Sequence, residues 1–165
     1  MKNTIALALL VTLVVVGTNR ADEMQVPDSK KTELGLYVTA KQAYEKWKAD
    51  PKNVKIIDVR TPEEYAFIGH PEMAWNIPLV FLTYEWDAER KRQKMRVNEK
   101  FLEQVKKIVK PSDTVLVTCR SGQRSGPAAN MIANAGFKKV YSVIDGVEGD
   151  KVTDPDNVFV GQRMK

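Results

Sequence analysis

Cysteine and histidine are scarce in this sequence: its 165 residues include one of each, Cys119 and His70. A single cysteine excludes an internal disulfide framework and a cysteine-based zinc site, and a single histidine excludes a histidine cluster. No metal and no organic cofactor is implied. With 43% hydrophobic and 28% charged residues, the composition is that of one globular domain. It excludes a disordered chain, a collagen-like repeat and a multi-span membrane protein.

Residues 1–21 have the pattern of a secretory signal peptide. Lys2 supplies a positive charge, and the apolar run 5–16 is shorter than the roughly 20 residues that a spanning helix needs. Ala21 suits the end of the leader, and Val15 with Gly17 marks an alternative cleavage site. We therefore expect an exported, periplasmic protein. Membrane association is expected only if the leader stays uncleaved as an anchor.

Cleavage after Ala21 removes the charges of Lys2 and Arg20, so the formal charge falls from +5 to +3. This excess is mild, and no basic stripe with interleaved aromatic residues accompanies it, so no nucleic-acid partner is expected. In an oxidising compartment, a lone Cys119 is either buried and inert or reactive for a purpose.

The remaining chain divides into three parts. The polar residues 22–36 are expected to form a linker or an arm lying on the domain, and residues 37–150 form the domain itself. Residues 151–165 have the composition of a loop-like tail. Asp150 stands at the boundary between the domain and this tail.

The domain alternates between strand and helix patterns. Apolar, β-branched runs predict strands over 54–59, 74–79, 114–118 and 140–144. Helices are predicted after the caps Thr39 and Thr61, and at helical spacing over 97–108 and 128–135. Strands separated by helices imply an α/β fold, with a mainly parallel sheet of about five strands and helices on both faces.

The segment 119–125 (Cys-Arg-Ser-Gly-Gln-Arg-Ser) follows a predicted strand and precedes a helix, where open α/β sheets bind ligands. A tight loop there turns backbone N–H groups inward, and the helix adds its positive end. Helix N-termini and nearby arginines lower a cysteine pKa from about 8.5 to roughly 3.5–7.5. We therefore expect Cys119 to be a thiolate without a histidine base. His70 lies in a Gly-His-Pro turn on another connection, which disfavours a Cys–His dyad.

At these positions the sequence resembles the single-domain rhodaneses, a family of sulfurtransferases. The resemblance extends over roughly residues 35–150 and rests on four segments in family order: the loop 119–125, the segment 57–65 (Ile-Asp-Val-Arg-Thr-Pro-Glu-Glu-Tyr), Gly69-His70 followed by Ala74, Asn76, Ile77 and Pro78, and Gly136-Phe137 leading to Val140 and Asp145-Gly146.

The resemblance implies a covalent mechanism in which Cys119 attacks the sulfane sulfur of a small anionic donor, such as thiosulfate or polysulfide, and becomes a persulfide. A thiol, cyanide or a sulfur-acceptor protein then takes the sulfur. The backbone N–H groups of the loop would hold the persulfide, and two arginines would attract anionic donors. The implied substrate-binding residues are Arg120, Ser121, Gly122, Gln123, Arg124 and Ser125.

Related phosphatases and arsenate reductases place an arginine six positions after the cysteine. Here Ser125 occupies that position and Arg124 comes one residue earlier, so the smaller ring favours sulfur transfer over phosphate chemistry. Asp58 and Arg60 match the family's Asp-Val-Arg stretch. They either brace the loop through hydrogen bonds or form an ion pair that stabilises the fold.

Residues 79–96 look longer than the matching connection of the smallest rhodaneses. Their basic residues favour a solvated helical face. The alternative is that the aromatic residues line the mouth of the active site while the basic ones attract anionic donors. The tail also departs from the family, which often has a tryptophan near Asp150.

Three functions follow from the resemblance. The first is an exported thiosulfate sulfurtransferase that works through a Cys119 persulfide. The second is a polysulfide-sulfur transferase or carrier that delivers sulfur to a partner. The third is a non-catalytic, sulfide-binding rhodanese-like module, against which the presence of Cys119 argues.

Overall fold

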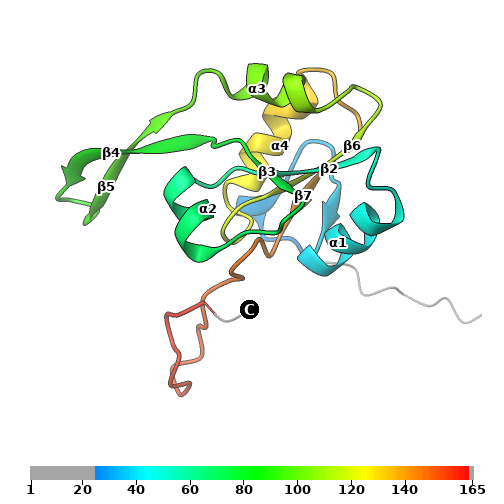
Figure 1. Ribbon diagram of the computed structural model, residues 1–165. Coiled ribbons are helices and arrows are strands. Elements are labelled where there is room, and N and C mark those ends of the chain that lie inside the picture. The colour runs from blue at the N-terminus through cyan, green and yellow to red at the C-terminus, as the bar shows by residue number, and fades with distance from the viewer. Residues whose placement is uncertain (1–24, 164–165) are drawn as a thin grey trace, which may run out of the picture.

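The structure, a computed structural model, describes residues 25–163 and is built on a five-stranded parallel sheet (Figure 1). The strand order is β1-β7-β6-β2-β3. The predicted parallel α/β sheet is confirmed, and the four predicted strands all occur with ends that differ from the expected ones by at most three residues. The strands are β1 (Tyr37–Val38), β2 (Val54–Asp58), β3 (Ala74–Asn76), β6 (Thr114–Thr118) and β7 (Val140–Val143).

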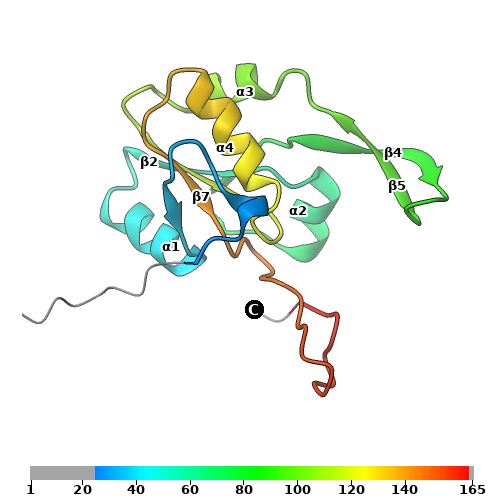
Figure 2. The same cartoon turned by 180° about the vertical axis from the view of Figure 1, so that it is seen from behind.

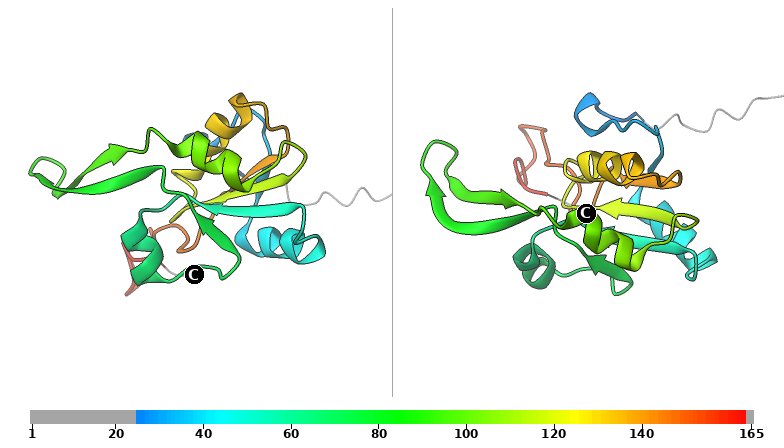
Figure 3. Two further views of the ribbon diagram at one scale, coloured as in Figure 1. Left: turned by 45° about the horizontal axis from the view of Figure 1, so that its top comes forward. Right: turned by 90° about the horizontal axis from the view of Figure 1, so that it is seen from above.

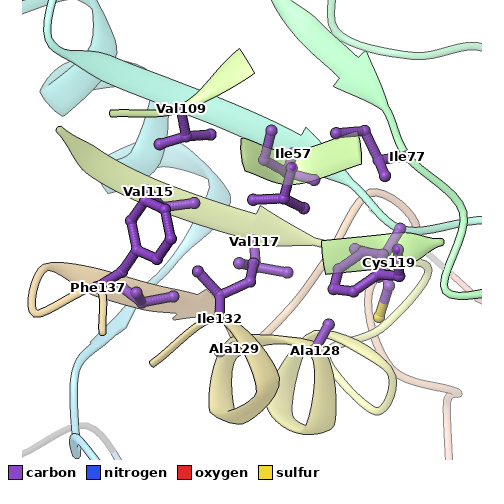
Figure 4. Close-up of a cluster of buried hydrophobic side chains, with 14 residues drawn as sticks. Ile57, Ile77, Val109, Val115, Val117, Cys119, Ala128, Ala129, Ile132 and Phe137 are labelled. Atoms are coloured by element: carbon purple, nitrogen blue, oxygen red, sulfur yellow. The ribbon is translucent and has the colours of Figure 1, made fainter. Parts of the chain in front are cut away.

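Two apolar cores lie on opposite faces of this sheet. One joins β2 and β6 to α3 and α4, and Figure 4 shows its side chains with Cys119 at one end. The other joins the reverse face of the sheet to α1. Because β2 and β6 are covered on both sides, each has adjacent apolar residues that point to opposite faces, Ile56 with Ile57 in β2 and residues 115–117 in β6. The helices are α1 (Ala40–Ala49), α2 (Pro62–Ile68), α3 (Phe101–Ile108), α4 (Ser125–Asn134) and the short 3₁₀ helix η1 (Asp28–Lys30).

Both predicted helix caps are present. Thr39 accepts a hydrogen bond from the N–H of Gln42, whose side chain returns the bond. Thr61 and Glu64 form the same capping box on α2, with Pro62 in the first turn. Each box satisfies two N–H groups that a helix start otherwise leaves without partners. The cap of α2 also places Glu64 at the carboxyl end of β2.

The predicted helical face over residues 79–96 is wrong. This segment forms an antiparallel hairpin of β4 (Val80–Asp87) and β5 (Arg92–Val97). Figures 1 and 3 show it projecting from the body of the domain. Aromatic and β-branched residues favour the strand state here. The side chain of Tyr84 is fully exposed. The alternative, that aromatic residues of this segment line the mouth of the active site, stays a prediction.

The start of α3 also differs from the prediction. Val97 shares the helical spacing of Phe101 and Val105, yet it ends β5 and is exposed. Asn98 lies between β5 and α3. Its side chain donates to the carbonyl of Pro78 and accepts from the N–H of Lys100. These local bonds compete with an extra helical turn.

The arm and the tail meet beside the carboxyl end of the sheet. Lys30 of η1 is buried, and its ammonium group donates to the carbonyl of Ile144 and to the carboxylate of Asp150. Beyond Asp150, the tail extends away from the sheet (Figure 2). Within residues 25–163, no helix combines the length and the apolar character needed to cross a bilayer. The predicted signal peptide lies outside the described residues.

The fully buried ion pair between Asp58 and Arg60 generates a stability prediction. The Asp58 carboxylate accepts from the backbone N–H, Nε and Nη2 of Arg60, the last at 2.7 Å. Asp58→Ala leaves a buried guanidinium without its counter-charge, so the free energy of unfolding should fall by about 3–5 kcal/mol. Urea denaturation checks this. Glu103→Ala, which removes an exposed partner of Lys107, is the control and should change little. Equal midpoints for the two variants would contradict the prediction.

Candidate active site

Cys119 lies directly after β6, in the loop that leads into α4. β6 is the central strand, between β7 and β2, so the loop opens at the carboxyl edge of the sheet. Parallel strands place ligand sites at this edge. The position is therefore the one that the sequence predicted.

The sulfur of Cys119 is held by the loop's own backbone. Its Sγ accepts hydrogen bonds from the N–H of Gly122 at 3.2 Å and from the N–H of Arg124 at 3.3 Å. The residue is only 1% exposed and belongs to the apolar core (Figure 4). Two backbone donors therefore point at the sulfur, and the start of α4 adds the positive end of a helix dipole beside the loop. The ionisation of Cys119 itself stays a prediction.

The loop fits only because two glycines permit close packing. Gly122 has a φ of +89°, and a Cβ on it would collide with the carbonyl oxygen of Ile144. Gly146 has a φ of +57°, and a Cβ there would strike the backbone of Cys119 and Arg120. Left-handed backbone and backbone-to-backbone contact both require glycine. Residues 144–148 therefore pack directly against the loop and restrict its conformation.

Hydrogen bonds also hold the loop against residues 144–148. The carbonyls of Cys119 and Arg120 accept from the N–H groups of Val147 and Glu148, both at 2.8 Å. Ser125 is fully buried, and its hydroxyl donates to the carbonyl of Gly122 at 2.9 Å and lies 2.9 Å from the Ser142 hydroxyl. The side chain of Ser125 therefore braces the peptide of Gly122, and the predicted role of its backbone N–H in holding the substrate stays a prediction.

Three further loop residues were predicted to bind the donor. Ser121 is buried, and Gln123 is exposed and donates from its amide to the hydroxyl of Ser29 in the arm. Arg120 is about half exposed, and its Nε donates to the carboxylate of Glu148 at 2.9 Å. The other oxygen of Glu148 is buried and has no hydrogen-bond partner within residues 25–163.

Arg124 does not present a free guanidinium to the loop. Its two terminal nitrogens donate to the two carboxylate oxygens of Glu64, both at 2.6 Å. Burial alone would lower the pKa of Arg124, but the hydrogen bond and charge of Glu64, with smaller contributions from Cys119 and Asp58, raise it. The fork that we expected to face anionic donors is thus occupied by Glu64.

Asp58 and Arg60 support the neighbouring strand end. Besides their mutual pairing, Arg60 donates from Nη2 to the carbonyl of Gly69 at 2.8 Å, and Asn76 donates to the carbonyls of Asp58 and Arg60. The N–H of Val59 donates to the carbonyl of Thr118, directly before the Cys119 loop. This arrangement fits both earlier interpretations, since the pair stabilises the fold and anchors the strand beside the loop.

His70 is engaged elsewhere. Its ring stacks on that of Tyr65, with centroids 3.6 Å apart, and its Nδ1 lies 2.9 Å from the Tyr65 carbonyl. The hydrogen bonds that Cys119 Sγ accepts come from backbone amides, in line with the expectation that no Cys–His dyad forms. Within residues 25–163, no group of three or more His, Cys, Asp or Glu side chains is placed to hold a metal ion.

The sequence reasoning missed the two glutamates that pair with the loop arginines. Glu64 was recognised only as part of a capping box, and Glu148 was not singled out. For Glu64 a signal existed, because a helix that starts at the carboxyl end of β2 must begin beside the loop that follows β6. Glu148 gave no such signal, since its position depends on how residues 144–148 fold under the loop.

The pairing of Glu64 generates a pH prediction. Burial alone would raise the pKa of Glu64, but hydrogen bonds from Arg124 and the Thr61 N–H, with the positive charges of Arg124 and Arg120, hold it below its ordinary value of 4.5. A lowered pKa stabilises the fold above pH 4.5, and this contribution is lost as the pH falls through the lowered pKa. Glu64→Gln, which keeps the capping geometry, should therefore lose less stability across that acid range. Melting temperatures of both proteins over a pH series check this, and parallel curves would contradict it.

Comparisons with known proteins agree with this geometry. The family model for the rhodanese-like domain matches residues 39–151, well over half of the chain. Thiosulfate sulfurtransferase 18 of Arabidopsis thaliana is 40% identical over 90 residues, covering 54% of this chain and 61% of that protein. Thiosulfate sulfurtransferase 16, chloroplastic, of the same plant is 37% identical over 92 residues, covering 56% and 69%.

A solved structure shares the arrangement of elements. The crystal structure of Rv0390 from M. tuberculosis superposes with a TM-score of 0.57 at 26% identity, covering 76% of this chain and 85% of that one. The chain belongs to the rhodanese-like domain family.

Proposed function

We propose that this protein is a sulfurtransferase that moves sulfane sulfur from a small donor to a thiophilic acceptor through a persulfide on Cys119. One observation carries the proposal: the loop aims the N–H groups of Gly122 and Arg124 at the Cys119 sulfur. The names of the Arabidopsis relatives support the same chemistry. The fixed amides act as an electrostatic cradle for an anionic sulfur and need no reorganisation during the reaction.

The reaction needs two displacement steps. In the first, the Cys119 thiolate attacks the outer sulfur of thiosulfate, a new S–S bond forms, and the old S–S bond breaks as sulfite leaves with the electron pair. In the second, an acceptor such as cyanide attacks the outer sulfur of the persulfide, thiocyanate leaves, and the Cys119 thiolate is regenerated. Covalent catalysis thus divides one transfer between two mobile anions into two reactions at a fixed sulfur.

Phosphate chemistry fits this loop less well. The residue six positions after Cys119 is Ser125, whose hydroxyl is turned inward to Gly122 and Ser142. Arg124 is paired with Glu64. A phosphoryl group would need cationic side chains that bind its oxygens. In this loop, two backbone N–H groups instead converge on a single sulfur atom.

The proposed function predicts first how the nucleophile behaves. The purified protein, incubated with thiosulfate, should gain the mass of one sulfur atom and form thiocyanate when cyanide is added. Cys119→Ser should abolish both, since serine forms no persulfide. Intact mass spectrometry and a thiocyanate assay measure the two steps. A loaded protein without turnover would indicate the non-catalytic module, and turnover only with polysulfide would indicate the polysulfide transferase. No loading from either donor would refute the proposal.

The second prediction concerns the loop geometry. Gly122→Ala should slow sulfur loading at least about tenfold, because the added Cβ collides with Ile144 and shifts the N–H groups that face the sulfur. Gly136→Ala is a matched control, since Gly136 also has a positive φ but its Cβ would meet nothing within 4 Å. This control should lose about 1 kcal/mol of stability and keep its loading rate. Equal loading rates in the two variants would count against the cradle.

Export is part of the proposed function. The sequence predicts cleavage after Ala21, and amino-terminal sequencing of the protein recovered from its host would test the site. A protein that retains residues 1–21 would instead support the anchored form.

A further inference from the structure

Four cation–carboxylate pairs surround the Cys119 loop. Two involve arginines of the loop itself, one lies at the end of the neighbouring strand, and one joins the arm to the start of the tail. In each pair a single positive group meets a single negative group, so the eight side chains together carry no net charge. The pairs are Arg120–Glu148 at 2.9 Å, Arg124–Glu64 at 2.6 Å, Arg60–Asp58 at 2.7 Å and Lys30–Asp150 at 2.7 Å.

From this balance we infer that Glu64 and Glu148 set the donor specificity of the loop. They cancel the attraction that its two arginines would exert on a dianion. The site therefore favours sulfane donors that carry at most one negative charge over thiosulfate. The class that fits is the hydropersulfide of a small organic thiol, R–S–SH. This inference rests on the proposed sulfur transfer and specifies its donor.

The argument depends on which charges an approaching donor meets. The amides of Gly122 and Arg124 bind one anionic sulfur whatever the donor's remaining charge. A second negative charge has to be stabilised by side chains, and both arginines of the loop already have carboxylates at hydrogen-bond distance. The effect of a charge pair on a third ion is the difference between two nearly equal terms, so it is small.

The two glutamates differ in how tightly they hold their arginines. Glu64 and Arg124 form a two-fold hydrogen bond and are both about one-fifth exposed. Glu148 binds Arg120 through one hydrogen bond, and Arg120 is 48% exposed. The second oxygen of Glu148 is buried without a partner within the described residues, so its negative charge is less compensated. A substitution of Glu148 should therefore change the charge balance around the loop more than a substitution of Glu64.

The chemistry with a hydropersulfide balances without another reactant. The Cys119 thiolate attacks the outer sulfur of R–S–SH, and the S–S bond of the donor breaks. The thiolate R–S⁻ leaves with the electron pair and takes the proton of the transferred sulfur. The enzyme persulfide Cys–S–S⁻ remains, and its single charge is seated against the loop amides. With thiosulfate the same step must release sulfite, which carries two negative charges.

The test measures second-order rate constants for sulfur loading by quenched intact mass spectrometry, with thiosulfate and with the hydropersulfide of a small uncharged thiol. In Glu148→Gln, the ratio of the thiosulfate constant to the hydropersulfide constant should rise about three- to tenfold at low salt, as expected for one charge removed a few ångströms from a dianion. Added salt should shrink this rise, because it screens an interaction at the surface. Glu103→Gln breaks an exposed pair on α3 and should leave the ratio at the wild-type value.

Two more variants guard against a misfolded Glu148→Gln. Glu64→Gln should move the ratio in the same direction, whereas Arg120→Gln leaves Glu148 uncompensated and should lower it. An unchanged ratio in all three variants, or a change of the same sign in all three, would overturn the inference while leaving sulfur transfer intact. Failure of the wild-type protein to load from either donor would instead refute the proposed function, and the inference with it.

Discussion

The interaction on which this structure depends is the pair of hydrogen bonds from the Gly122 and Arg124 amides to the sulfur of Cys119. Cys119 is only 1% exposed, so solvent offers its sulfur almost no hydrogen bonds. The inward-facing amides of the loop supply hydrogen bonds to the sulfur instead. These hydrogen bonds form only if the loop keeps one conformation, and several segments distant in sequence stabilise that conformation.

Those segments converge from three directions. Residues 144–148 pack against the loop so closely that Gly122 and Gly146 have no room for a side chain. Ser125 ties the peptide of Gly122 to β7 from below. The arm reaches the same place through Lys30, whose ammonium group binds the Ile144 carbonyl. Cys119 is therefore positioned by long-range packing, although the residues that surround it are consecutive in sequence.

Much of this could be predicted from the sequence, because it depends on local rules. Capping residues located α1 and α2, apolar runs located β2 and β6, and the strand–loop–helix pattern located Cys119. The hairpin 80–97 could not be placed, since its basic residues mask a strand alternation that is interrupted between Leu82 and Trp86. The partners of Arg120 and Arg124 were missed for a different reason. Each ion pair joins segments far apart in the chain, 28 residues for Glu148 and 60 for Glu64.

The neutral surroundings of the loop also have a consequence for how the two arginines act. A guanidinium held by a carboxylate contributes little to long-range attraction, yet its position is fixed, and Arg124 is held at both ends of its fork. Its backbone N–H is one of the two that reach the sulfur. Glu64, anchored by the cap of α2, therefore constrains the residue whose amide faces Cys119. In this arrangement Arg124 contacts the Cys119 sulfur through its main chain, and its side chain links the loop to the first turn of α2.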